Sequence, residues 1–284
     1  MRWPTIRLLL LMFAALPLVA ATPARAAPHD PLEIGICPYY SAHVLLDQFE
    51  PMRAFLQARL ERPVSLVSAR DFLTFAERTR QRQYPIIVTV AHLARLAQVD
   101  SGYRPLLQMK ARLAGVFLVE KNSPYGSVAD LRGHSVGTPD RLAIITILGE
   151  EALDHQGLSS PTDVQLNPLP THNAAILSVL YGENAGALVW EKTLGTMEPD
   201  VQARMRPIGT TAALPTPALF LADRDLPPAE AEAVTAAILA FAAGEGGKVF
   251  SEKTRFEGII PVREEDLHFL DRFLPFVRRA LAGP

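Results

Sequence analysis

The sequence predicts an α/β protein of two lobes, each a mainly parallel sheet flanked by helices, joined by a hinge of two crossing strands. Short apolar strands alternate with amphipathic helices along most of the chain, a pattern typical of parallel sheets covered on both faces. Two long apolar strands, 113–119 and 217–222, bracket a central unit. The chain has 284 residues and is long enough for two hydrophobic cores, even if an N-terminal signal peptide is removed.

The first 26 residues are expected to be a signal peptide. Arg2 and Arg7 precede an apolar run at 8–21, and Ala24-Arg25-Ala26 follows it, which predicts cleavage after Ala26. The run is too short to span a bilayer readily. We therefore expect an exported protein in the periplasm.

The first lobe is expected over residues 27–114 and 215–284. LEIGIC alternates in polarity and ends at Pro38, which predicts a strand followed by a loop. The next elements are a helix at 49–62, a strand at 63–69, a helix at 71–82, a strand at 85–91 and a helix at 92–99. After the second lobe, the strand at 217–222 leads into an Ala-rich helix at 228–243 that ends at Gly244. A last amphipathic helix is expected within 256–281.

The second lobe is expected over residues 115–214. It opens with the strand 113–119 and continues with a short helix and a strand within SVADLRGHSVGTP. The following elements are a helix at 143–155, a strand at 164–168, a helix at 173–181 and a strand at 187–190. Ligands of such lobes lie at the carboxyl ends of the strands, in the crevice between them.

The turn GTPD before the helix at 143–155 is a candidate anion site. A helix that begins at a loop presents unpaired N–H groups and a positive dipole end. Arg141 adds a guanidinium that can hold an oxyanion or a carboxylate by two parallel hydrogen bonds. The alternative is that Thr138 or Asp140 only caps the helix.

The other candidate ligand-binding residues also stand at strand ends or helix starts. Tyr39 and Tyr40 follow the first strand, where their rings and hydroxyls can cover a ligand. His92 and His172 each open a helix, so each either contacts an anion or caps its helix. Trp190 ends a strand, where it either faces the cleft or packs in the core.

Cys37, the single cysteine, ends the first strand. It is either a small buried residue or a thiolate ligand for a soft species such as arsenite or a transition metal. The sequence has no H-x-x-x-H or C-x-x-C spacing, so we expect no other metal ligands and no cofactor.

Composition and motifs argue against two classes of protein. Without the leader, 25 basic residues face 30 acidic ones, and no basic–aromatic stripe occurs, so nucleic acid is not an expected partner. The chain has no G-x-S-x-G, no Gly-rich phosphate loop and no H-E-x-x-H. We expect a binding protein rather than an enzyme, with a periplasmic enzyme as the least favoured alternative.

Several stretches resemble the phosphate/phosphite/phosphonate-binding family of periplasmic solute-binding proteins, which serve ABC importers and have the type 2 periplasmic-binding fold. The stretches are EIGICPYYSAHVLLDQFEPMRAFLQARLERPVSLVSA, AHLARLAQ, KNSPYGSVADLRGHSVGTPD and THNAAILSVLYGENAGALV. The resemblance implies a ligand cleft between lobes that close by hinge motion.

This sequence departs from the ligand-site pattern of the family. The phosphoryl-binding Ser-Thr-Ser-Gly turn falls on Arg141-Leu142-Ala143-Ile144 by gapless placement. An acid at the end of the third strand falls on Pro85, and an amine-binding acid falls on Ala185. The tyrosine that follows the third-strand acid falls on Thr89, which is a further candidate ligand-binding residue. Only His172 keeps a ligand-site position. The resemblance therefore implies a small anionic ligand other than an aminoalkyl phosphonate, or a lobe pair kept for signalling.

Two partners fit such a binding protein. The first is the permease of an ABC importer, and the second is the periplasmic domain of a sensor histidine kinase that responds to an oxyanion or arsenite. In both cases we expect a monomer whose closed form is read by the partner.

Overall fold

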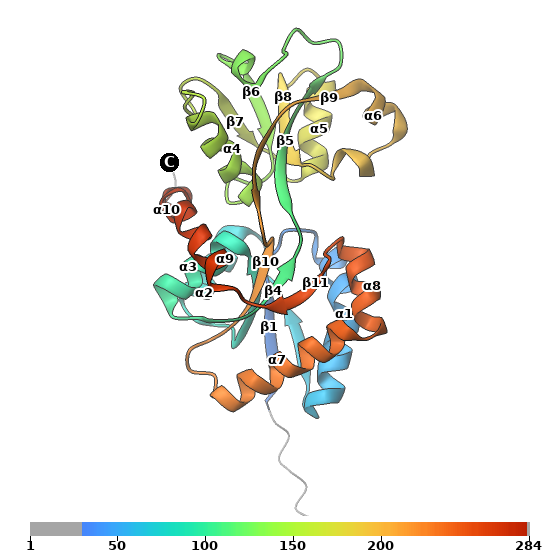
Figure 1. The fold of residues 1–284 in the computed structure, drawn as a ribbon, viewed down its shortest axis with the longest axis vertical. Coiled ribbons are helices and arrows are strands. Elements are labelled where there is room, and N and C mark those ends of the chain that lie inside the picture. The colour runs from blue at the N-terminus through green and yellow to red at the C-terminus, as the bar shows by residue number, and fades with distance from the viewer. Residues whose placement is uncertain (1–29, 283–284) are drawn as a thin grey trace, which may run out of the picture.

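The structure is a computed structural model that describes residues 30–282. The expected signal peptide, residues 1–26, lies outside this range. Two lobes stand one above the other, and two segments of the chain join them (Figure 1). The α/β fold class predicted from the sequence is confirmed.

The first lobe contains a six-stranded sheet in the order β11-β4-β10-β3-β1-β2. Its strands are β1 (Leu32–Ile36), β2 (Val64–Val67), β3 (Ile86–Val90), β4 (Arg104–Lys110), β10 (Ala218–Ala222) and β11 (Gly258–Pro261). β1 pairs in parallel with β2 and β3, whereas β10 is antiparallel to β3 and β4. The carboxyl ends of β1, β2 and β3 therefore share one edge of the sheet.

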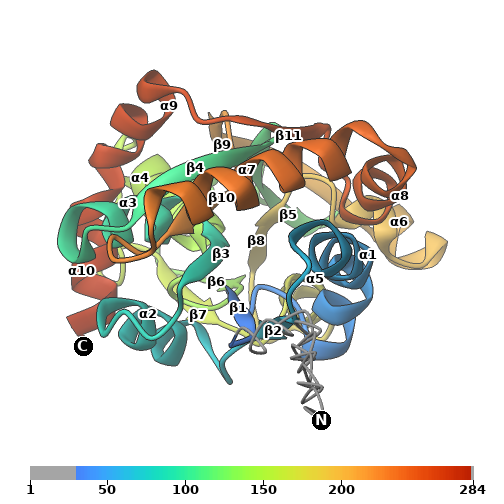
Figure 2. The same ribbon diagram turned by 90° about the horizontal axis from the view of Figure 1, so that it is seen from below.

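Helices cover both faces of this sheet (Figure 2). One core packs Ile34, Ile86 and Val88 against α1 (Ala42–Leu60), α7 (Pro228–Ala243) and α8 (Glu245–Thr254). The other packs Ile87 against α2 (Phe72–Arg80), α3 (Ala91–Ser101) and the C-terminal segment. Because neighbouring strand residues point to opposite faces, Ile86 and Ile87 serve different cores.

The second lobe contains a five-stranded sheet in the order β7-β6-β8-β5-β9. Its strands are β5 (Leu113–Glu120), β6 (Ser135–Thr138), β7 (Gln165–Pro168), β8 (Gly186–Trp190) and β9 (Met205–Leu214). The helices are α4 (Ile144–Asp154), α5 (His172–Leu180) and α6 (Pro199–Arg204), with short 3₁₀ turns at Val128–Leu131 and Leu194–Thr196. β6 is parallel to β7 and β8, so the carboxyl ends of these three strands also share an edge.

The chain passes from the first sheet to the second between Lys110 and Leu113, and returns between Leu214 and Ala218. On the basis of these two crossings, we propose lobe boundaries near residues 114 and 215. Strands β4 and β9 were not predicted from the sequence, because each contains a proline. Pro105 of β4 sits at a register shift against β10, and Pro207 lies in the edge strand β9, the two settings in which strands tolerate proline.

The C-terminal segment differs from the single amphipathic helix expected there. Residues 256–281 contain β11 and then α9 (Glu264–Phe269), a 3₁₀ turn at Leu270–Phe273 and the first part of α10 (Leu274–Ala282). Gly258 has a φ of 145°, which is incompatible with a helix and favours glycine. Pro261 then ends the strand before α9.

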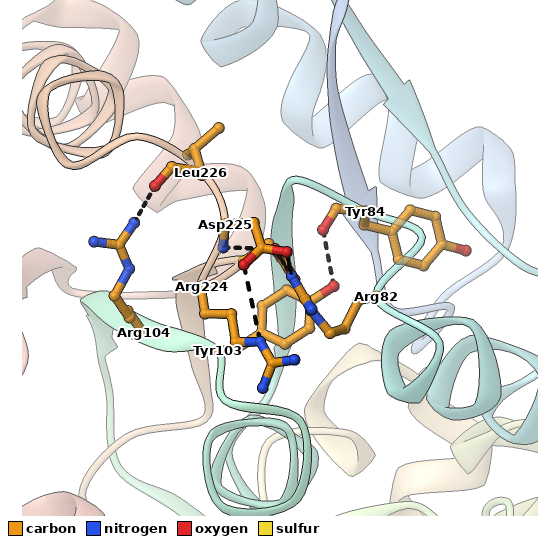
Figure 3. A network of polar contacts seen from close by, with 8 residues as sticks. Arg82, Tyr84, Tyr103, Arg104, Arg224, Asp225 and Leu226 are labelled. Carbon is orange, nitrogen blue, oxygen red and sulfur yellow. Dashed lines mark hydrogen bonds and ion pairs between the residues drawn. The ribbon is translucent and has the colours of Figure 1, made fainter.

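An ion-pair network joins three loops at the amino end of β3 (Figure 3). Arg82 donates to Asp223 at 2.6 and 2.8 Å and also pairs with Asp225. The Tyr103 hydroxyl donates to the carbonyl of Tyr84 at 2.8 Å. This network fixes the edge of the first sheet that lies opposite the carboxyl ends of its parallel strands.

Among residues 30–282, no single helix has the length and apolar character needed to cross a membrane. Helices α7 and α8 meet that criterion only when taken together, and they are bent by 81°.

Candidate ligand-binding cleft

The carboxyl edges of the two sheets are in direct contact. His92 follows β3 at the start of α3, and its Nε2 lies 2.8 Å from the carbonyl oxygen of Leu142. Leu142 belongs to the turn 139–143, which joins β6 to α4 in the other lobe. The cleft is therefore closed at this point, with the predicted anion-binding turn held against the first lobe.

Asp140 builds the turn that carries Arg141. The Asp140 carboxylate accepts from the N–H of Leu142 at 2.8 Å, and the Thr146 hydroxyl donates to the carbonyls of Pro139 and Asp140. The N-cap of α4 is Ala143, which has no side chain able to cap the helix. The N–H groups at the start of α4 thus keep no side-chain partner, as an anion site requires.

Arg141 is half-buried in this turn. Its guanidinium forms no hydrogen bond or ion pair with another residue of the described range, 30–282. Thr138 is fully buried at the end of β6, with its hydroxyl 3.5 Å from the carbonyl of Asn167. Arg141, rather than Thr138, is the polar group of the turn that remains available to a ligand.

His172 and Trp190 lie together in the second lobe. Thr171 caps α5 by accepting from the N–H of Ala174, so His172 is not needed as a cap. Nδ1 of His172 accepts from the backbone N–H of Trp190 at 3.3 Å. Burial lowers the pKa of His172 to about 4, so the ring is neutral at pH 7 and its proton sits on Nε2 as a donor.

Trp190 presents a second donor. Its Nε1 is buried and has no hydrogen-bond partner among the described residues. Lys192 follows β8 and places its Nζ 5.5 Å from the centre of the Trp190 ring. The cation and the indole N–H together favour an electron-rich ligand at the carboxyl end of β8.

Among the described residues, the unpaired ring nitrogen of His92 is a hydrogen-bond acceptor, whereas those of His172 and Trp190 are donors. Burial lowers its pKa to about 4, so the ring is neutral at pH 7. A carbonyl can only accept, so Nε2 carries the proton that is donated to Leu142. Nδ1 is then a bare acceptor, and it is buried with no partner within the described part of the chain.

Tyr39 and Tyr40 behave differently from each other. Their rings lie 5.2 Å apart between centres, and Tyr40 is 40% exposed. The Tyr39 hydroxyl is buried without a partner in residues 30–282, and burial raises its pKa far above the usual range. Tyr39 therefore offers a neutral hydroxyl to the interior, while Tyr40 lies at the surface.

Thr89 points away from this group. It is buried in β3 on the same face as Ile87, and it lines a cavity of about 340 Å³ between α2, α3 and α10. A second cavity, of about 610 Å³, lies beside the crossing segments and includes Arg112 and Leu214 in its wall. Neither wall contains the other candidate ligand residues.

Cys37 is fully buried at the end of β1. Burial raises the pKa of its thiol to about 12, although the hydroxyl of Thr89 and the backbone of Val90 act in the opposite direction. The sulfur is therefore a protonated thiol at pH 7. Residues 30–282 contain no group of three or more His, Cys, Asp or Glu side chains placed to hold a metal ion. This environment favours the buried, structural alternative for Cys37.

Two of the departures from the family pattern do not concern the cleft. Pro85 precedes β3, and its carbonyl accepts from the N–H of Asp223, the residue that pairs with Arg82. Ala185 precedes β8, and its N–H donates to the carbonyl of Ser135 at the start of β6. Both lie at the amino ends of their strands, so the gapless placement of cleft acids on them is wrong.

The sequence analysis did not select Glu191 or Lys192, which directly follow β8. Glu191 pairs with Arg112 of the crossing segment at 2.8 Å. Their position after a strand that ends in the candidate Trp190 was the signal for both. An acid thus remains at the carboxyl edge of the second sheet, already paired with a cation.

The family model of the phosphonate ABC-transporter periplasmic substrate-binding proteins matches residues 34–267. The chain belongs to this family. The resemblance inferred from the sequence is confirmed, and the family consists of substrate-binding proteins of the periplasm rather than enzymes.

Solved structures of binding proteins share the fold. The chloride-bound protein XAC2383 from Xanthomonas citri is 17% identical with a TM-score of 0.76, over 89% of this chain and 99% of that one. PhnD1 from Prochlorococcus marinus, in complex with methylphosphonate, is 14% identical with a TM-score of 0.74, over 87% and 98%. The periplasmic aliphatic sulphonate binding protein SsuA from Escherichia coli is 18% identical with a TM-score of 0.63, over 90% and 94%. These similarities confirm the type 2 periplasmic-binding fold.

Proposed function

We propose that this substrate-binding protein captures a small oxyanion of the phosphonate or sulfonate type between its lobes and presents it to the permease of an ABC importer. The observation that carries the proposal is the half-buried Arg141 without an ion pair within residues 30–282, at the uncapped start of α4. The family match and the methylphosphonate- and sulphonate-binding relatives support the ligand class.

In the described range, the unpaired groups of the two lobes include both donors and an acceptor, which favours a ligand that can both accept and donate hydrogen bonds. Trp190 Nε1, His172 Nε2 and Arg141 donate, whereas His92 Nδ1 accepts. Buried polar groups are nearly always paired in native proteins. A protonated oxyanion, with both O⁻ and O–H groups, matches this mixed set better than a fully ionised one.

The test is binding of methylphosphonate, phosphite, phosphate and methanesulfonate, followed by isothermal titration and by thermal shift. A ligand at a hundred times its Kd raises stability by about 2.7 kcal/mol. Arg141→Ala is expected to weaken binding by at least tenfold, since a charge-assisted hydrogen bond contributes about 1.5–3 kcal/mol. Arg59→Ala removes the same charge from an exposed position in the last turn of α1 and serves as the control. Equal binding by wild type and Arg141→Ala would contradict the assignment.

The importer and the sensor-kinase hypotheses predict different genes beside the gene for this protein. Permease and ATPase genes beside this gene would agree with the proposed importer. A histidine kinase gene in that place would instead indicate the sensor.

A further inference from the structure

We infer that the C-terminal segment Glu264–Ala282 is a brace between the lobes, and that Arg272 and Glu151 are positioning residues that set ligand affinity through closure. The inference rests on the proposed function only for its ligand. The brace itself is visible as α9 and α10, which extend from the first lobe toward α4 of the second (Figure 1).

The segment is anchored to the first lobe by ion pairs with α3. Arg95 of α3 donates to Asp271 at 2.6 and 3.1 Å. Arg278 of α10 donates to Asp100 of α3 at 2.6 Å. Leu267, Leu270, Phe273 and Val277 lie in one buried cluster with Leu93 of α3 and with Ile144 and Ile147 of α4. The ion pairs with α3 therefore anchor the segment to the first lobe, while its apolar side chains also reach the second.

The same segment also contacts the second lobe. Nε of Arg272 donates to the Glu151 carboxylate of α4 at 2.7 Å, and Nη2 contacts the same oxygen. The Glu151 side chain is only 10% exposed. The Arg272 guanidinium lies over the rings of Phe269 and Phe273, 5.1 and 5.5 Å from their centres. The aromatic rings hold the cation in position, which reduces the entropy lost when the pair forms.

The sequence of α4 fits this contact. Ile144, Ile147 and Glu151 are spaced three and four residues apart, so they share one face of the helix, and all three are buried. Gly149 packs on the opposite side, because an added Cβ would lie 2.0 Å from the Leu188 side chain of β8. The face that carries Glu151 therefore has partners beyond its own sheet: Arg272 contacts Glu151, and Leu270 and Phe273 belong to the buried cluster of Ile144 and Ile147.

The charge of Arg279 on α10 also acts on α4. Burial raises the pKa of Glu150, and Arg279 of α10 acts in the opposite direction. His92 bonds to Leu142 at the start of α4. Opening of the cleft by motion of the second lobe separates Arg272 from Glu151, which leaves a largely buried carboxylate unpaired. The apparent affinity for a ligand falls in proportion to the closed fraction.

The experiment measures closure without a ligand. Ala58 and Tyr181 are exposed in α1 and at the end of α5, so spin labels at Ala58→Cys and Tyr181→Cys in a Cys37→Ser background report the distance between lobes. Glu151→Gln, which keeps the shape and removes the charge, is expected to raise the open-to-closed ratio by roughly tenfold or more. Glu50→Gln makes the same chemical change in an exposed ion pair with Arg53 within α1, outside the C-terminal segment, and is expected to leave the ratio unchanged.

A double-mutant cycle isolates the pair. Arg272→Gln combined with Glu151→Gln is expected to shift the ratio no more than either change alone, because both remove one interaction. Methylphosphonate affinity should fall by the same factor as the closed fraction. An unchanged label distance in Glu151→Gln, or an equal change in Glu50→Gln, would overturn the brace. Absence of methylphosphonate binding in the wild type would count against the proposed ligand class and leave the label distances to decide about the brace.

Discussion

At the scale of single residues, the structure separates groups that the sequence placed together. Arg141, His172 and Trp190 lie at the carboxyl edge of the second sheet, and Tyr39 and His92 lie at that of the first. Thr89 belongs to the same strand end as His92 but faces a separate cavity. A strand alternates its side chains between faces, so position along a strand does not by itself place a residue in a cleft.

His92 gives the protein a pH-dependent stability. Its pKa is about 4 when folded, against 6.5 as its ordinary value. Between these values the unfolded chain binds a proton that the folded protein does not, so stability falls as pH decreases from about 6.5 to about 4. The loss is on the order of 3 kcal/mol for a fully buried ring.

The test compares melting temperatures at pH 7 and pH 5. In His92→Gln the amide nitrogen can replace Nε2 as the donor to Leu142, while the titration is removed. We expect a smaller decrease in melting temperature for this variant than for the wild type. Equal decreases would show that His92 titrates normally in the folded state.

Cys37 is expected to be unreactive in the native protein. Its thiol is fully buried with a pKa of about 12, and thiolates rather than thiols attack disulfide reagents. Ellman's reagent should therefore release one equivalent of chromophore only after unfolding. Cys37→Ser should leave anion binding intact, whereas fast native labelling or tight arsenite binding would restore the thiolate alternative.

At the scale of elements, two helices end at residues whose backbone lies in the left-handed region. α1 ends at Glu61, which has a φ of 51°, and α3 ends at Gly102, with a φ of 76°. The left-handed region is unfavourable for residues with a Cβ and accessible to glycine. Glu61 is therefore a strained position that sequence pattern alone identifies only as the end of a helix.

Glu61→Gly is expected to raise the free energy of unfolding by up to about 1 kcal/mol, because it relieves this strain.

Gly182→Ala is the converse substitution. Gly182 has a φ of 74°, and an added Cβ would have no atom within 4 Å, so the substitution acts on the backbone conformation alone. We expect it to destabilise by about 1 kcal/mol. Urea denaturation measures both, and changes of the same sign in the two variants would contradict the explanation.

At the scale of the whole molecule, closure depends on contacts between the lobes. The crossings at 110–113 and 214–218 allow hinge motion, whereas His92 and Arg272 connect α4 to the first lobe. Ligand affinity in such a protein includes the free energy of closing as well as the contacts in the cleft. Residues far from the ligand can therefore change affinity without touching it.

Export is also a property of the whole molecule. We expect the protein isolated from the periplasm to begin at Ala27 and to be a monomer, as intact mass spectrometry and light scattering can measure. Ala26→Leu should block cleavage, because the peptidase requires a small residue there. A periplasmic protein that retains residues 1–26, or a dimeric mass, would contradict these two expectations.

The sequence by itself determined the alternation of strands and helices, the family and the position of the Arg141 turn. These features depend on local periodicity and on short motifs, which neighbouring residues encode. The tertiary structure alone decided that Thr89 faces a separate cavity and that Cys37 is a protonated thiol. It also placed Pro85 and Ala185 at the amino ends of their strands, away from the carboxyl edges. It also joined Arg272 to Glu151 across 121 residues of sequence. Such contacts arise only when separate lobes pack together, because burial and partner choice depend on residues that no local pattern contains.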